Sequence, residues 1–96
     1  MTFPSANVTL GADVHVNFGV SVGHDSVLGD QVTICPGARI SGAVTVGDGV
    51  FIGTNAAIIQ GLTIGAGAVV GAGAVIRHDV APGTTVTGLL SPRPTT

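Results

Sequence analysis

An aliphatic residue recurs at every sixth position of this chain, without a gap, over most of its length. The members of this column are Leu10, Val16, Val22, Leu28, Ile34, Ile40, Val46, Ile52, Ile58, Ile64, Val70 and Ile76. A unit of six residues is too short to bury its own apolar side chain, so such units are stable only when they stack on copies of themselves. The repeat therefore predicts a β-solenoid.

Two further columns keep the same period. Small apolar residues lie two positions before the members of this first column, as at Val20 and Ala38. Ser26 is the polar exception among them. Ten of the twelve residues that follow by three, from Asp13 to Asp79, are Gly, Asn or Asp, which tolerate positive φ in tight corners. Each hexapeptide is then one strand and one corner. Three hexapeptides make a triangular coil of eighteen residues, and we expect an all-β prism of about four coils rising ~4.8 Å each.

Composition limits the classes of partner. The only cations are three arginines, and the net charge is −2, so the chain lacks the positive surface that nucleic acid requires. No stretch is apolar enough to span a bilayer, and the first residues lack the features of a secretory signal. The single cysteine, Cys35, forms no intrachain disulfide framework. We expect a cytoplasmic protein without nucleic-acid or membrane partners.

The organisation is simple. Residues 1–7 are expected to be a lead-in, 8–81 the solenoid and 82–96 a proline-rich tail without a further central strand. Several apolar residues occupy outward positions of the strands, namely Val27, Phe51, Val69 and Val75. Because a prism has flat faces, such residues favour packing against other chains, and we expect a homotrimer.

His24 is the main candidate for chemistry. It occupies a corner, Asp25 follows it, and Asn17 ends the preceding strand. An imidazole exchanges its proton near neutral pH, and a carboxylate or amide can orient it. The alternative is that His24 is an ordinary solvated corner residue, since His78-Asp79 occupies the same corner three coils later.

The sequence over 16–30, with Asn17 and His24-Asp25 followed by Val27-Leu28-Gly29, resembles the sugar acetyltransferases of the sialic-acid and bacillosamine pathways. The runs 34–38 and 46–55 extend this resemblance over nearly the whole solenoid. It implies a left-handed parallel β-helix, although most parallel crossovers are right-handed. It also implies an acyltransferase that moves acetyl from acetyl-CoA to an amine or hydroxyl of a sugar or nucleotide sugar.

The resemblance implies roles for individual residues. His24 matches the general base, Asp25 its acidic neighbour, Asn17 the upstream asparagine and Gly42 the backbone amide that faces the thioester oxygen. Positions that line the acetyl-CoA groove fall on Thr33, Gly42, Thr54 and Ala72, with Arg93 and Arg77 as the cations available for the phosphates. We expect direct transfer, without a covalent intermediate on Cys35.

Three departures from that family stand out. Thr33 replaces a second histidine that contacts the cofactor in many relatives. The C-terminal motif of the family is replaced by residues 88–93, which leaves Arg93 as its only cation. The relatives also carry an N-terminal domain for the nucleotide sugar, whereas this sequence starts at the solenoid. The chain is then either the catalytic part of a longer protein or acts alone on another acceptor.

Two other functions remain open. Some left-handed β-helices bind zinc through three histidines, but His24 and His78 are roughly 14 Å apart at ~4.8 Å per coil, and His15 lies on another face, so no metal site is expected. A non-catalytic binding or structural module is the main alternative. Outward threonines, Thr9, Thr45 and Thr63, form a ladder on one face, although Val27 interrupts it.

Overall fold

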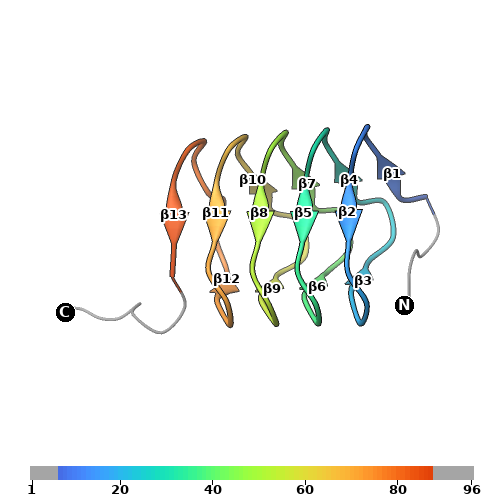
Figure 1. Cartoon of the computed structure of the whole chain (residues 1–96). Helices are drawn as coiled ribbons and strands as arrows, with labels where there is room; N and C mark the ends of the chain where they lie inside the picture. The colour runs from blue at the N-terminus through green and yellow to red at the C-terminus, as the bar shows by residue number, and fades with distance from the viewer. Residues whose placement is uncertain (1–6, 88–96) are drawn as a thin grey trace.

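A computed structural model of the chain describes residues 7–87, which coil into a prism built from strands of two residues each (Figure 1). The strands are β1 (Thr9–Leu10), β2 (His15–Val16), β3 (Ser21–Val22), β4 (Val27–Leu28), β5 (Thr33–Ile34), β6 (Arg39–Ile40), β7 (Thr45–Val46), β8 (Phe51–Ile52), β9 (Ala57–Ile58), β10 (Thr63–Ile64), β11 (Val69–Val70), β12 (Val75–Ile76) and β13 (Thr85–Val86). Within the described range there is no helix that could cross a membrane.

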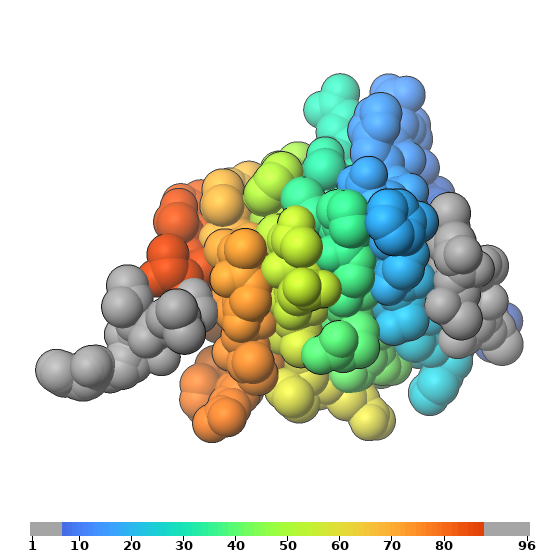
Figure 2. Space-filling view, turned by 60° about the horizontal axis from the view of Figure 1, so that its bottom comes forward, coloured from blue at the N-terminus to red at the C-terminus, as the bar shows by residue number. Residues whose placement is uncertain are grey.

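Three parallel sheets form the walls of the prism. The first sheet has the order β1-β4-β7-β10, the second β13-β11-β8-β5-β2 and the third β12-β9-β6-β3. Partners such as Thr9 and Val27 are eighteen residues apart, which confirms three hexapeptides per coil. Figure 2 shows the successive coils as parallel bands on the side that lies at the bottom of Figure 1.

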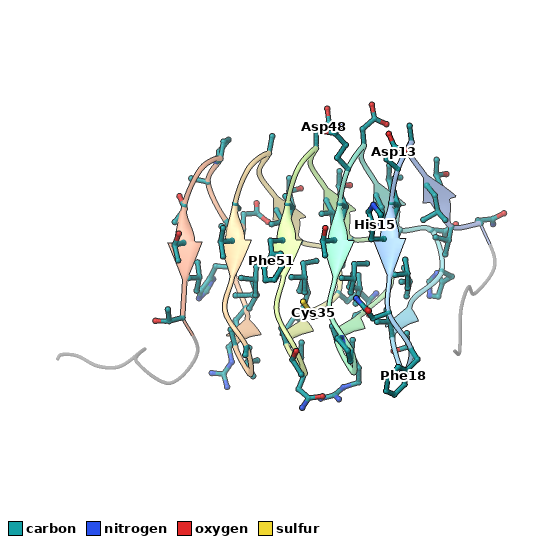
Figure 3. The ribbon with its side chains drawn as sticks, viewed as in Figure 1. Asp13, His15, Phe18, Cys35, Asp48 and Phe51 are labelled. Carbon is teal, nitrogen blue, oxygen red and sulfur yellow. The ribbon has the colours of Figure 1, made fainter. Side chains whose placement is uncertain are left out.

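The coil is left-handed, as the resemblance implied. In Figure 1 the chain advances from right to left, and Figure 3 places Asp13 at the top and Phe18 at the bottom of the near face. The chain therefore runs down the near face through β2 and returns along the far side through β3 and β4. A path that descends in front while advancing to the left has a left-handed sense.

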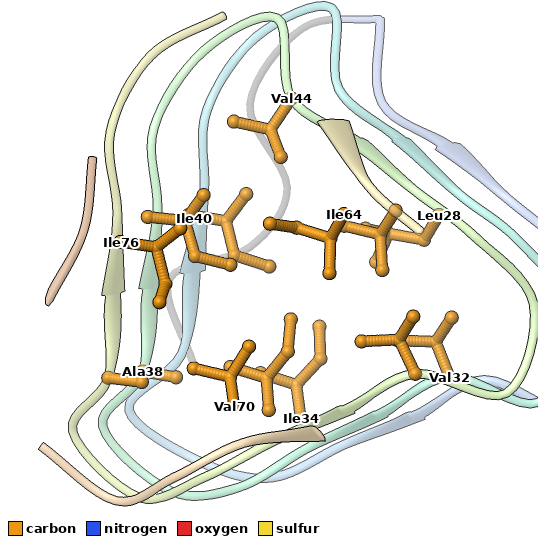
Figure 4. Close-up of a cluster of buried hydrophobic side chains, with 14 of the residues drawn as sticks. Leu28, Val32, Ile34, Ala38, Ile40, Val44, Ile64, Val70 and Ile76 are labelled. Carbon is orange, nitrogen blue, oxygen red and sulfur yellow. The ribbon is translucent and has the colours of Figure 1, made fainter. Parts of the chain in front are cut away.

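The core consists of aliphatic ladders, one along each wall (Figure 4). Along the second sheet, Ile34, Ile52 and Val70 stack at the spacing of the coils, and all are fully buried. The small residues that lie two positions before each member of the aliphatic column fill the space beside the corners. Ser26 belongs to this set and is the one buried polar residue of the described range. Leu10, in the first coil, is 43% exposed because it lies near the end of the stack.

The corners form three edges along the prism. The first edge contains residues 11–14, 29–32, 47–50 and 65–68; the second contains 17–20, 35–38, 53–56 and 71–74; the third contains 23–26, 41–44, 59–62 and 77–79. The third residue of these corners has positive φ from Asn7 to Gly73, as the Gly, Asn and Asp column predicted. The prediction is wrong at Asp79, which is absent from this set, and Gly83 takes its place.

Asp79 lacks the positive φ of the other corners because the coil to which it belongs is two residues short. Val80 pairs with Ile64 and Thr85 with Val69, so the spacing falls from eighteen residues to sixteen. In the regular coils an outward residue such as Thr45 donates its N–H to a backbone carbonyl of the next coil. Thr63 donates instead to Asp79 Oδ1 at 2.8 Å. The Asp79 carboxylate thus replaces a main-chain acceptor where the repeat is interrupted.

The solenoid also extends beyond residue 81, where the sequence placed its end. Val80 and Val86 resume the six-residue register after the short corner, and β13 pairs with β11. Pro82 is accommodated at the first edge, in a corner whose Gly83 has a φ of 71°. The remainder of the expected tail, residues 88–96, and residues 1–6 of the lead-in lie outside the described range.

Candidate active site

His24 and Asp25 lie side by side on the third edge, in the corner that joins β3 to β4. The His24 Nδ1 is 3.1 Å from Asp25 Oδ2, and the two side chains are 64% and 58% exposed. Asp25 has a φ of 62°, a conformation that Asp tolerates better than most residues. A neutral imidazole that donates its Nδ1 proton to this carboxylate presents Nε2 as a proton acceptor.

Gly42 lies against the His24 ring from the next coil. A Cβ atom at position 42 would be 3.0 Å from His24 Nε2 and 3.1 Å from its Cε1. The N–H of the following residue, Ala43, donates to the His24 carbonyl oxygen at 2.8 Å, which ties the two corners together. The structure therefore brings His24, Asp25 and Gly42 into one site, with Nε2 facing the Gly42 backbone.

The Gly42 amide is available as a donor. Gly42 is a buried residue, and within residues 7–87 its N–H has no hydrogen-bond acceptor. A donor held beside a proton acceptor suits a reaction in which negative charge develops on a carbonyl oxygen.

The remaining predicted residues do not join this cluster within one chain. Asn17, Thr54 and Ala72 all lie on the second edge, in successive or nearby coils, and Thr33 lies on β5 of the second sheet. The third sheet separates the second edge from the third, where His24 lies. The Asn17 amide donates from Nδ2 to the Ile34 carbonyl oxygen at 2.8 Å, a bond within its own edge.

Arg77, Cys35 and Arg93 complete the predicted set. Arg77 is exposed at the end of β12 on the third edge, and Cys35 is half-buried on the second edge, away from the corner of His24. Arg93 lies outside the described residues. Across residues 7–87 no three His, Cys, Asp or Glu side chains gather in a way that could hold a metal ion.

Two residues that support the site were not singled out from the sequence. Gly23 is required by close approach, because a Cβ there would be 2.5 Å from the Gly42 nitrogen. Ser26 directly follows the His24-Asp25 pair in the sequence, and its side chain is fully buried. Its hydroxyl forms hydrogen bonds with the corner that carries Gly42. The signal for Ser26 was present, since it is the polar exception in an otherwise apolar column.

Two family descriptions match the sequence. "Bacterial transferase hexapeptide (six repeats)" matches residues 43–78, and "Hexapeptide repeat of succinyl-transferase" matches residues 6–35. Together they cover most of the solenoid, with a gap at residues 36–42. None of the curated proteins matches the sequence significantly.

Solved structures give longer matches. WeeI from Acinetobacter baumannii AYE is 44% identical over 85% of this chain, with a TM-score of 0.84, and 41% of its own length is covered. Serine acetyltransferase from Neisseria gonorrhoeae, solved with serine, is 34% identical over 90% of this chain, with a TM-score of 0.82 and 39% of its length covered.

GDP-perosamine N-acetyltransferase from Caulobacter crescentus, solved as a mutant with CoA and GDP-perosamine, is 31% identical over 90% of this chain. The TM-score is 0.68, and 50% of that protein is covered. The chain thus spans half or less of the length of each of these proteins. The repeat, the left-handed coil and both sequence matches agree, and the chain belongs to the hexapeptide-repeat family of bacterial transferases.

Proposed function

We propose that this chain is the catalytic solenoid of an acetyltransferase that uses acetyl-CoA as donor and a small amine or alcohol as acceptor. The observation that carries the proposal is the juxtaposition of His24 Nε2 with the Gly42 backbone, beside a carboxylate on Nδ1. Two of the similar structures are named as acetyltransferases, one bound to CoA and a nucleotide sugar and the other to serine. A sugar or nucleotide-linked amino sugar is the acceptor we favour.

The proposed reaction is a direct transfer. His24 Nε2 takes the proton of the acceptor amine or hydroxyl, and the acceptor attacks the thioester carbonyl carbon. The oxygen that becomes negative accepts a hydrogen bond from the Gly42 N–H. The carbon–sulfur bond then breaks, and the imidazolium returns its proton to the departing thiolate. Asp25 holds the imidazole in the orientation that leaves Nε2 free.

Direct transfer is favoured over an acyl-enzyme. A nucleophilic cysteine needs an activating base within hydrogen-bond reach. Cys35 is on the second edge, and its backbone N–H donates to the Ile52 carbonyl oxygen within that wall, whereas His24 is on the third edge. The base and the thiol therefore lie on different sides of the prism.

The site needs a second protomer in this proposal. Asn17, Thr54 and Ala72 share an edge that His24 does not reach in its own chain. In a homotrimer with cyclic symmetry, the second edge of one prism can face the third edge of its neighbour. The groove between them would hold the pantetheine arm along the prism axis, with Thr33 at its wall, Arg77 near the phosphates and Asn17 beside the acceptor. We also propose that Arg93 contacts the phosphates and that the protein acts in the cytoplasm.

The test is release of free CoA from acetyl-CoA in the presence of L-serine, a free amino sugar or a nucleotide-linked amino sugar. We expect turnover with one of these acceptors and a loss of about 10²-fold or more in His24→Ala. His78→Ala is the matched control, because His78 occupies the same edge three coils away and should leave the rate unchanged. No turnover with any acceptor, or full activity in His24→Ala, would overturn the proposal.

A further inference from the structure

Ser26 is the buried polar residue that the reaction scheme leaves unused. Its side chain is fully buried, and the other positions of the same column hold Val, Ala or Leu. The hydroxyl donates to the Ser41 carbonyl oxygen at 3.0 Å and accepts from the Val44 N–H at 3.2 Å. Ser41 and Val44 are the first and last residues of the corner whose second residue is Gly42.

In some of the other corners the first and last residues bond to each other directly. The last N–H donates to the first carbonyl at 3.2–3.4 Å in five corners, which end at Ala38, Ala56, Ala68, Ala74 and Thr84. In the corner of residues 41–44 these same two groups bond through the Ser26 hydroxyl. The hydroxyl therefore bridges the two ends of this corner, in the place of the direct bond found in those five corners.

This hydroxyl links the two halves of the candidate site. Ser26 lies two residues after His24, and the corner that it enters is the one that carries the Gly42 amide. The usual bond between successive coils is also present here, from the Ala43 N–H to the His24 carbonyl at 2.8 Å. The corner of residues 41–44 is thus fixed to the corner of His24 by three hydrogen bonds.

We infer that Ser26 is a positioning residue, whose hydroxyl sets the orientation of the Gly42 N–H relative to the His24 imidazole. This inference rests on the proposed function, because it gives Ser26 a role in aligning the base and the donor to the developing oxyanion. Small displacements of such donors matter, since an error of about 1 Å in a catalytic geometry can cost ~10²-fold in rate.

The chain offers a matched pair of variants. Thr and Val have nearly the same shape, so Ser26→Thr keeps a hydroxyl where Ser26→Val places a methyl group. Val fits this column, because the residues one coil before and after are Val8 and Val44. We therefore expect both variants to fold, and thermal unfolding measured for each will show this.

We expect Ser26→Val to lower kcat about tenfold or more while leaving the KM for acetyl-CoA within about twofold, because a misaligned donor weakens the transition state rather than binding. Ser26→Thr should restore most of kcat. In amide proton–nitrogen spectra, the Gly42 and Val44 resonances should move in Ser26→Val and return in Ser26→Thr, with Gly67 and Gly73 unchanged in both.

The two proposals fail in different ways. Absence of turnover in the unmodified chain overturns the proposed function, and the spectra then decide the geometric inference alone. An unshifted Gly42 resonance in Ser26→Val overturns that inference. So does a Ser26→Val variant with full kcat in an otherwise active protein, or an equal loss of kcat in the Thr and Val variants.

Discussion

At the scale of single residues, the absence of a side chain at position 42 is what admits the His24 imidazole. A Cβ there would be 3.0 Å from Nε2, so the ring would have to give way by a few tenths of an ångström. The backbone itself would tolerate alanine, because Gly42 is not among the residues with positive φ. Gly42 therefore serves the site by its small size and not by unusual conformation.

Gly42→Ala should consequently lower the rate of acetyl transfer at least about tenfold while the solenoid stays folded, because the displaced imidazole loses its alignment. Gln60→Ala is the control, since Gln60 occupies the same corner position one coil later and is exposed. Initial rates of CoA release and a thermal melt of both variants check this. Unchanged activity in Gly42→Ala would contradict the arrangement described for the ring and the amide.

At the scale of the element, the short corner of residues 77–79 shows how a solenoid accommodates a deletion. Two missing residues remove a backbone acceptor from the Thr63 N–H, and Asp79 Oδ1 supplies one at 2.8 Å. The replacement allows β13 to add to the second sheet, so the coil continues in a new register.

Asp79→Ala should therefore destabilise the chain by about 1 kcal/mol, because the Thr63 N–H loses its partner at an exposed position. Asp79→Asn keeps a side-chain oxygen and should retain most of the stability. Equilibrium unfolding in urea distinguishes the two variants. Wild-type stability in Asp79→Ala would show that water replaces the carboxylate without cost.

The regular part of the fold could be predicted from the sequence more fully than the short corner and the contacts of the site. The six-residue column and the Gly, Asn and Asp column predicted the strands, the coil length and nearly every corner, because the repeat imposes the same local geometry each time. The short corner broke that rule, and nothing in the pattern showed that Val80 and Val86 would resume it. His24 and Asp25 could be found from their positions in the repeat, and the resemblance gave Gly42 as an amide donor, whereas the contact of Gly42 with the ring was seen only in the structure.

The role of Ser26 could not be predicted in the same way. Ser26 is visible in the sequence as an exception in the apolar column. The hydrogen-bond partners of its hydroxyl, however, depend on the position of the next coil relative to its own. The separation of Asn17, Thr54 and Ala72 from His24 could be predicted, since their spacings from His24 are not multiples of the eighteen-residue coil.

At the scale of the whole molecule, the proposed site joins the third edge of one prism to the second edge of a neighbour. This arrangement predicts complementation between His24→Ala and Ala72→Trp chains, each inactive alone. When the two chains assemble at random from an equal mixture, roughly a quarter of all sites combine an intact His24 with an intact Ala72, and activity should return to that extent. Light scattering checks that the chain is trimeric, and inactive hybrids of proven mixed composition would contradict a shared site.

Acetyl-CoA binding tests the central claim most directly, by calorimetric titration into the unmodified chain, His24→Ala and Ala72→Trp. Ala72→Trp should fold, because Phe18 occupies the same position of the second edge and is 75% exposed. We predict binding by the unmodified chain and by His24→Ala, and none by Ala72→Trp, whose indole would fill the groove. No binding by the unmodified chain, or equal binding by Ala72→Trp, would contradict the account.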